Sequence, residues 1–329
     1  MSSPEPWFGK PPADGLTFLT VGETALIIGS ISDHHRGGIM FSRLSNSWEL
    51  VKESAAVLRA DKELIVYPIV SSIGTLVVTA TFIVPIFASG LIDAVLSGGT
   101  DRIDLFGLAV MFVFYLAQYF IILFANSALV GAALIRLRGG DPTLADGFRI
   151  AVTHLGAIIG YALIAATVGM ILRSLAQRRA SVLGRIAISL IGMAWNLATF
   201  LVVPVLVVED VGPIEAIRRS AELLKKTWGE QIVGNFGIGG VFGLLSFAYV
   251  VVIGVVLGYL AFTFNSLVLL LALIGLVVVG LVIIGLVSST LSGIFAAAVY
   301  RYAAEGATDS YIRPEFVQNA FQLSKSGTL

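Results

Sequence analysis

Cysteine is absent from this sequence of 329 residues, and charged residues make up only 13% of it. The first absence excludes disulfide bonds, thiol nucleophiles and cysteine-ligated metals. The second sets the chain apart from soluble domains, in which about 25% of residues are charged. Lysine plus arginine (21) equals aspartate plus glutamate (21), so no net charge attracts an acidic partner. We therefore expect no nucleic-acid partner.

Hydrophobic residues, by contrast, make up 57% of the sequence, and the mean hydropathy is +0.93. They form uncharged runs that are long enough to cross the ~30 Å hydrocarbon core of a bilayer as helices. The last run is long enough for two crossings, with a turn near Asn265. This pattern predicts an all-α fold, a polytopic membrane helix bundle with about six transmembrane helices. The runs are residues 64–92, 105–135, 156–172, 186–208 and 231–300.

A stretch between two of these runs has the pattern of an amphipathic helix. Gly212 and Pro213 provide a start, because proline is tolerated at the first helical position. Apolar residues then recur every three or four positions with charged residues between them, which predicts a helix lying in the membrane interface. A helix packed on protein is the alternative. The apolar stripe consists of Ile214, Ile217, Ala221, Leu224 and Trp228.

Similar amphipathic elements precede the other pairs of runs, at residues 44–58 and 144–155. An amphipathic helix followed by a helix hairpin would therefore occur three times. In the second and third units, residues 142–145 align with 213–216, and residues 153–160 with 227–234. We interpret the pattern as a threefold repeat, which is a known way to build membrane folds, and chance alignment of similar helices is the alternative.

The first 39 residues differ from the rest of the chain. They are rich in proline and glycine and contain no apolar run long enough to span a bilayer. We expect residues 1–39 to be disordered, or to precede the natural start of translation at Met40. Residues 40–305 are expected to form the integral membrane domain, and residues 306–329 a polar tail.

Basic residues beside the spans predict the orientation in the membrane. With six crossings, most lysines and arginines fall on the side of the N-terminus, which the positive-inside rule places in the cytoplasm. We expect a multi-pass protein of a prokaryotic plasma membrane with both termini cytoplasmic. The arginines between Arg173 and Arg185 would then lie outside, an objection that disappears if the third span is re-entrant.

Residues able to carry a reaction are scarce. His154 is the only histidine after residue 35, and one imidazole does not make a metal site. The sequence has no nucleophile motif and no glycine-rich loop of the kind that follows a strand. The spans contain no Asp, Glu, Lys or Arg, which argues against an ion or proton pump. We expect no catalytic residue, no metal site, no cofactor and no enzymatic activity.

Amide side chains inside the spans are the candidate intramembrane polar contacts. An amide in lipid needs a partner, and interhelical hydrogen bonds of this kind contribute about 0.6 to 2 kcal/mol each. Structural contacts between helices are therefore the first interpretation, and the alternative is that the amides line a path for a solute. The four residues are Gln118, Asn126, Asn196 and Asn235.

The chain also contains a set of short motifs: Ala194-Trp195, residues 203–206 (VPVL), Gly212-Pro213, Ala216, Arg219-Ser220, residues 226–229 (KTWG) and residues 295–303 (FAAAVYRYA). Together they resemble a family of prokaryotic six-helix membrane proteins of unknown function. The resemblance covers residues 41–321, and it extends distantly to the membrane domain fused to some glycerophosphodiester phosphodiesterases. It implies an architecture but no activity, because the phosphodiesterase chemistry belongs to a separate catalytic domain.

Two functions fit these observations. The first is a non-enzymatic integral membrane protein with a structural, partner-binding or bilayer-organising role. Its partners would be the lipid bilayer and another membrane protein or a second copy of itself. The second is a transporter or channel for a small uncharged or amphiphilic solute. Amides paired across dry helix contacts would favour the first function, and amides converging on a cavity would favour the second.

Overall fold

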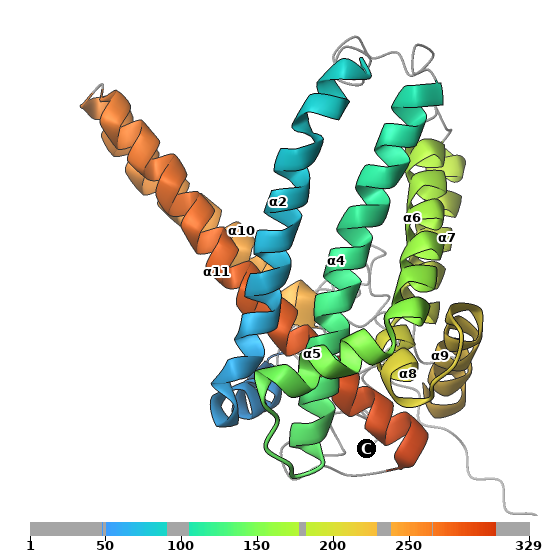
Figure 1. Ribbon diagram of the computed structural model, residues 1–329. Helices are drawn as coiled ribbons and strands as arrows, with labels where there is room; N and C mark the ends of the chain where they lie inside the picture. Colours follow the sequence, from blue (N-terminus) through green and yellow to red (C-terminus); the bar gives the residue numbers. More distant parts are fainter. Residues whose placement is uncertain are drawn as a thin grey trace, which may run out of the picture. The chain divides into compact units, whose positions relative to one another are not determined.

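The computed structural model describes residues 48, 51–90, 105–177, 182–228, 238–264 and 266–306. Every regular element in these residues is a helix (Figure 1), and the prediction of an all-α fold is confirmed. Within these ranges, six helical segments are long and apolar enough to cross a membrane. The expectations for residues 1–39 and for the tail after residue 306 lie outside the described residues.

The six segments follow the order of the uncharged runs. The first is α2 (Val66–Ala88), which the 3-10 turn η1 (Lys62–Ile65) precedes, and the second is α4 (Leu105–Leu137). The third is α6 (Leu155–Gln177), and the fourth is divided into α7 (Val182–Ala198) and α8 (Val202–Val208). The last two are α10 (Ile238–Thr263) and α11 (Leu267–Tyr300), and α11 continues into the π-helical turn η4 (Arg301–Glu305).

A short helix precedes each pair of spans. Residues 51–60 are helical before η1, α5 (Leu144–Thr153) precedes α6, and α9 (Pro213–Trp228) precedes α10. A capping box starts α5, because the side chains of Thr143 and Asp146 each accept a hydrogen bond from the other residue's backbone N–H. The order of elements expected for a threefold repeat therefore occurs three times along the chain.

Helix α9 is packed on protein, against α6, α7, α8 and η4. Its buried side chains include Ala216, Ser220 and Leu224. Ile214, the first residue of the predicted stripe, is 71% exposed, so the packed face is rotated from the predicted one. The packed face combines the small residues Ala216 and Ser220 with the leucines Leu223 and Leu224. The side chain of Trp228 lies outside the description.

The third span is one helix that is long enough to cross. Helix α6 has 23 residues, which at about 1.5 Å per residue gives about 34 Å, enough for a bilayer core. The re-entrant alternative is therefore not supported. Near the end of α6, Arg173 donates a hydrogen bond of 2.8 Å to the hydroxyl of Tyr115 in α4. The basic connector thus follows a helix of full spanning length, and the objection to the predicted orientation stands.

Helix α4 is the centre of the packing. It contacts α2, α5, α6, α8 and α11, and its residues Ala128, Val130 and Ala133 are fully buried. Helix α11 changes its surroundings along its length (Figure 1): side chains from Thr290 onward are mostly buried, whereas the earlier part pairs with α10 and exposes apolar side chains. In a bilayer such surface is solvated by lipid, whose tails are as apolar as leucine.

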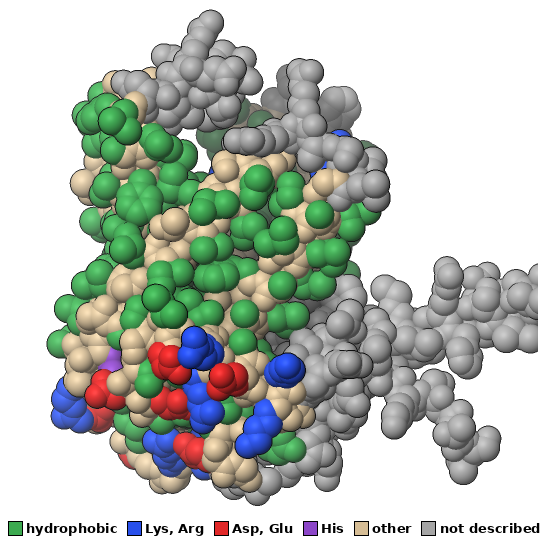
Figure 2. Space-filling model, turned by 90° about the vertical axis from the view of Figure 1, so that its right-hand side faces the viewer, with side chains coloured by type: hydrophobic (Ala, Val, Ile, Leu, Met, Phe, Trp, Pro, Cys, Tyr) green, Lys and Arg blue, Asp and Glu red, His purple; other side chains and the backbone are tan. Residues whose placement is uncertain are grey.

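Charged side chains gather at one end of the spans, in a band below an uncharged surface in Figure 2. Glu209, after α8, accepts hydrogen bonds of 3.0 to 3.1 Å from Arg219 of α9 and Tyr300 of α11. Arg301 donates to the carbonyl oxygen of Leu137 at 2.6 Å and so joins the end of α11 to the end of α4. The last residues of α4, α8 and α11 therefore lie together, at what we call the charged end.

Candidate functional site

The fourth span is interrupted between Ala198 and Val202. The physical cause is Pro204, which has no backbone N–H and whose ring clashes with the carbonyl group four residues earlier, that of Phe200. A continuous helix through this carbonyl is therefore disfavoured, and the chain makes a short non-helical link before α8 begins. The predicted fourth span, residues 186–208, is confirmed as one candidate span, Gly184–Val208, and the break lies within it.

Hydrogen bonds hold the residues of the break. Thr199 donates from its backbone N–H and from its hydroxyl to the carbonyl oxygen of Trp195, at 3.0 and 2.8 Å. The backbone N–H of Leu201 donates to Ser220 Oγ of α9 at 3.0 Å. Since a buried backbone N–H needs a partner, α9 supplies the acceptor that a continuous helix would have provided.

A pocket of about 300 Å³, which we call the amide pocket, lies beside the break. Residues of α4, α6 and α11 line it together with residues of the broken fourth span. The residues that line it among those described include no Asp, Glu, Lys or Arg. Its polar side chains are Asn126, Tyr161, Thr199, Ser289 and Ser292.

Asn126 of α4 has no side-chain hydrogen-bond partner within the described part of the chain. The room beside it depends on Gly293 of α11. A Cβ atom at that position would lie 2.5 Å from Leu129 Cδ2 and 3.4 Å from Asn126 Oδ1. A carboxamide, with two N–H donors and an acceptor oxygen, therefore faces open space inside the bundle.

The other predicted amides do not join Asn126. Gln118, two turns earlier on α4, donates to Thr79 Oγ1 at 2.9 Å and to the carbonyl oxygen of Thr75 at 3.3 Å, across the contact with α2. Asn196 is exposed on α7. Asn235 lies outside the described residues. Of the four candidates, the structure thus places one in the pocket and one in a contact between two spans.

Three further polar groups of the amide pocket, those of Tyr161, Ser289 and Ser292, were not singled out from the sequence. Tyr161 of α6 is 6% exposed, and Ser289 and Ser292 lie in the last third of α11. The available signal is the segment SSTLS at residues 288–292, a cluster of hydroxyls inside a long uncharged run. Pro204 is likewise a signal for the break, because prolines disrupt the helical hydrogen bonds around them.

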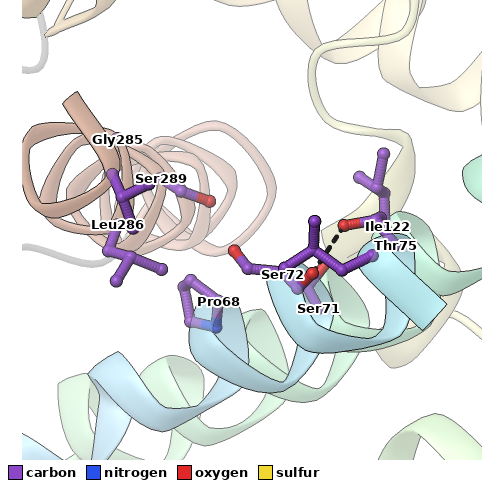
Figure 3. Close-up of a pocket in the computed structure, with 10 residues that line it drawn as sticks. Pro68, Ser71, Ser72, Thr75, Ile122, Gly285, Leu286 and Ser289 are labelled. Atoms are coloured by element: carbon purple, nitrogen blue, oxygen red, sulfur yellow. Dashed lines mark hydrogen bonds between the residues drawn. The ribbon is translucent and has the colours of Figure 1, made fainter. Parts of the chain in front are cut away.

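A second pocket, of about 460 Å³, lies between α2, α4 and α11 (Figure 3). We call it the serine groove. Helix α2 contributes the hydroxyl side chains of Ser71, Ser72 and Thr75, and α11 contributes Gly285 and Ser289. Ser289 borders this groove and the amide pocket. The two pockets are therefore neighbours.

His154 lies outside both pockets, at the C-terminal end of α5. Its Nδ1 lies 2.9 Å from the carbonyl oxygen of Ile150, and its Nε2 lies 3.9 Å from Asp210 Oδ1. The contact with Ile150 is a local one, between the side chain and the last turn of its own helix, α5. The ranges that the structure describes contain no group of three His, Cys, Asp or Glu side chains able to hold a metal ion.

The model of a family of unknown function, DUF6159, matches residues 105–310, well over half of the chain. The chain belongs to this family. No curated protein and no solved structure matches the DUF6159 chain, so the distant likeness to the membrane domain of glycerophosphodiester phosphodiesterases gains no support. The match includes every residue that lines the amide pocket, but not the α2 side of the serine groove.

Proposed function

We propose that this DUF6159 protein is a multi-pass membrane protein that binds a small uncharged or amphiphilic molecule in the amide pocket. The observation that carries the proposal is the amide of Asn126, which faces the pocket without a partner among the described residues. Asn126 is half-buried, and an amide among membrane helices gains about 0.6 to 2 kcal/mol from a hydrogen-bond partner. A ligand with a hydroxyl, ester or amide group would recover this free energy on binding.

The residues around Asn126 support an uncharged ligand. The pocket offers an amide, a phenol and hydroxyls, which together donate and accept hydrogen bonds. A charged ligand would lose its hydration without meeting an opposite charge among the described lining residues, which is costly in a bilayer. The volume of about 300 Å³ is at the lower end of the range for small-molecule sites.

Transport is the activity that we favour for this site. Carriers commonly bind their solutes beside discontinuous helices, where two helical segments can move relative to one another. Here Thr199 and Phe200, in the break between α7 and α8, form one wall of the pocket. We propose no reaction, because an amide, a phenol and hydroxyls bind and orient a ligand but form no acid–base or nucleophile pair.

A structural or bilayer-organising role is the second candidate function, and Gln118 favours it. Its two hydrogen bonds join α4 to α2 through Thr79 and Thr75. Bonds of this kind stabilise helix contacts in membranes without any ligand. A membrane-protein partner or a second copy of the chain would belong to this role.

Paired amide variants test the proposal. Protein in nanodiscs is heated with 1-octanol, octanamide or monooctanoylglycerol, three amphiphiles with different uncharged head groups. We expect at least one of them to raise the unfolding midpoint saturably in the wild-type protein but not in Asn126→Leu.

Gln118→Leu is the matched control, because it removes an amide from the same helix but outside the pocket. This variant should have a lower midpoint without ligand, since it loses a bond between α2 and α4, and it should keep the shift on adding the amphiphile. No saturable shift in the wild-type protein, or an equal shift in Asn126→Leu, would refute ligand binding and leave the structural role.

A further inference from the structure

The amide pocket and the serine groove lie at the same depth. Asn126 is 11 residues before Leu137, the last residue of α4 (137 − 126), and Ser289 is 11 residues before Tyr300, the last residue of α11 (300 − 289). The two helix ends are joined through Arg301. At about 1.5 Å per residue, both side chains lie about 16 Å along their helices from the charged end. Both pockets therefore lie near the middle of the hydrocarbon core, which is about 30 Å thick.

The rim of the serine groove faces the surroundings of the bundle. Leu76 of α2, Ile122 of α4 and Val282 of α11 line the groove, and they are 69%, 46% and 50% exposed. At this depth the surroundings are the acyl chains of the bilayer. A molecule in the groove would therefore come from the lipid phase and not from water.

The floor of the groove carries hydroxyls that are free to bind. In Figure 3 the hydroxyl of Thr75 bonds to the carbonyl oxygen of Ser72, at 2.9 Å, as expected for such a side chain within a helix. The hydroxyls of Ser71, Ser72 and Ser289 have no partner in the described ranges of the chain. Ser289 is also exposed, and it borders the amide pocket. Ser289 thus borders both the groove, which opens to lipid, and the pocket that contains Asn126.

We infer that the serine groove is a lateral entrance from the bilayer and that the ligand is a lipid-derived amphiphile with one acyl chain and an uncharged, hydroxylated head. The head passes the serine hydroxyls and binds at Asn126, while the chain stays in the groove between α2 and α11. This inference rests on the proposed function, because it gives the amide pocket its ligand class. It goes further in predicting that closing the groove prevents binding even when the amide pocket is intact.

Gly285 offers a way to close the groove without disturbing the fold. It lines the groove, and a Cβ atom at this position would meet nothing within 4 Å. Gly285→Leu should therefore place an isobutyl group in the space that the acyl chain would occupy. Gly275 is the matched control, because it lies on the same helix, has equally open surroundings and does not line the groove.

The test is photo-crosslinking in nanodiscs with a monoacylglycerol that carries a diazirine in the middle of its chain, with and without excess unlabelled monooleoylglycerol. In the wild-type protein we expect competable labelling of residues 68–76 and 282–289. Gly285→Leu should reduce it by about tenfold or more, the change that 1.4 kcal/mol of binding free energy produces. Gly275→Leu should keep it.

Asn126→Leu separates the two proposals. Loss of labelling in Asn126→Leu and in Gly285→Leu supports both. Loss in Asn126→Leu alone would overturn the lateral entrance and leave the proposed function standing. Loss in Gly285→Leu alone would show that the groove holds a lipid chain independently of the amide pocket, which contradicts the inferred ligand position. Unchanged labelling in both variants, or labelling that monooleoylglycerol does not compete, would overturn the inference as well.

Discussion

Ser220 Oγ, on the buried face of α9, accepts a hydrogen bond of 3.0 Å from the backbone N–H of Leu201 in the break of the fourth span. Both residues are fully buried. The neighbouring residues Thr199 and Phe200 form a wall of the amide pocket. The amphipathic helix therefore has a definite structural task, which is to hold the interrupted backbone beside the pocket.

Removing this acceptor should destabilise the protein. Ser220→Ala would leave the N–H of Leu201 buried and unpaired, which we expect to cost about 1 to 3 kcal/mol. The free energy of unfolding is measured by titration with a denaturing detergent. Ser174→Ala is the control, since this exposed hydroxyl donates its hydrogen bond to the carbonyl oxygen of Ile171 in its own helix. An equal loss in the two variants would contradict the role assigned to Ser220.

Asp61 should make stability depend on pH. Its side chain accepts a bond from the backbone N–H of Glu63 at the start of η1, yet the residue is 8% exposed and its Oδ2 has no partner in the described part of the chain. Burial raises the pKa of Asp61 above its usual value. A folded-state pKa above the unfolded one means that the protonated form favours folding, and that this stability is lost as the pH rises through the folded pKa.

Asp61→Asn is the corresponding variant, because asparagine keeps the capping oxygen without the charge. We expect it to be more stable than the wild-type protein at pH 7.5 and to differ little at pH 3.5, below the usual aspartate pKa of about 3.9. Thermal unfolding at both pH values measures this. Asp210→Asn serves for comparison, since the side chain of Asp210 is 96% exposed. The same pH response in both variants would mean that the burial of Asp61 has no effect.

Cysteine labelling tests the predicted orientation. Because the sequence has no cysteine of its own, only the introduced residue can react. The charged end carries Arg149, whose side chain is 76% exposed, and Phe264, between α10 and α11, is 68% exposed. With the charged end in the cytoplasm, Phe264→Cys should react with a membrane-impermeant maleimide in intact cells, and Arg149→Cys only after permeabilisation. The reverse pattern would place the charged end outside.

Uncharged runs predicted the spans well, because the cost of placing charges in a bilayer limits where helices can cross. The second run, residues 105–135, corresponds closely to α4, Leu105–Leu137. The amide pocket could not be predicted in this way. Asn126 is visible as a polar residue, but the space beside it depends on Gly293 of another helix, and therefore on how α11 packs on α4.

The packed face of α9 could likewise be predicted from the sequence only in part. Hydrophobic periodicity identifies the side of a helix that carries large apolar residues, such as Ile214, because these residues gain most from removal from water. The face that packs on the bundle instead contains Ala216 and Ser220, because close contact between helices in membranes favours small residues. Periodicity therefore identified the helix but gave its packed face only in part, through Leu224.

Two aspartate substitutions on α9 distinguish packing on protein from seating in the membrane interface. Leu224 is 2% exposed and Ile214 is 71% exposed. Leu224→Asp should lose apolar burial of about 1.5 to 3 kcal/mol and add the cost of burying a carboxylate. We expect hydrogen exchange in nanodiscs to show lost protection over residues 215–227 in this variant and nearly normal protection in Ile214→Asp.

The position of Ile214 explains why its substitution should be tolerated. It lies in the first turn of α9, where a carboxylate interacts favourably with the helix dipole, and its side chain contributes little to the packed face. Arg218→Ala, at a side chain that is 67% exposed, provides a second mild change for calibration. If Ile214→Asp lost as much protection as Leu224→Asp, the bilayer and not the bundle would hold α9, and its support of the break at Leu201 would be secondary.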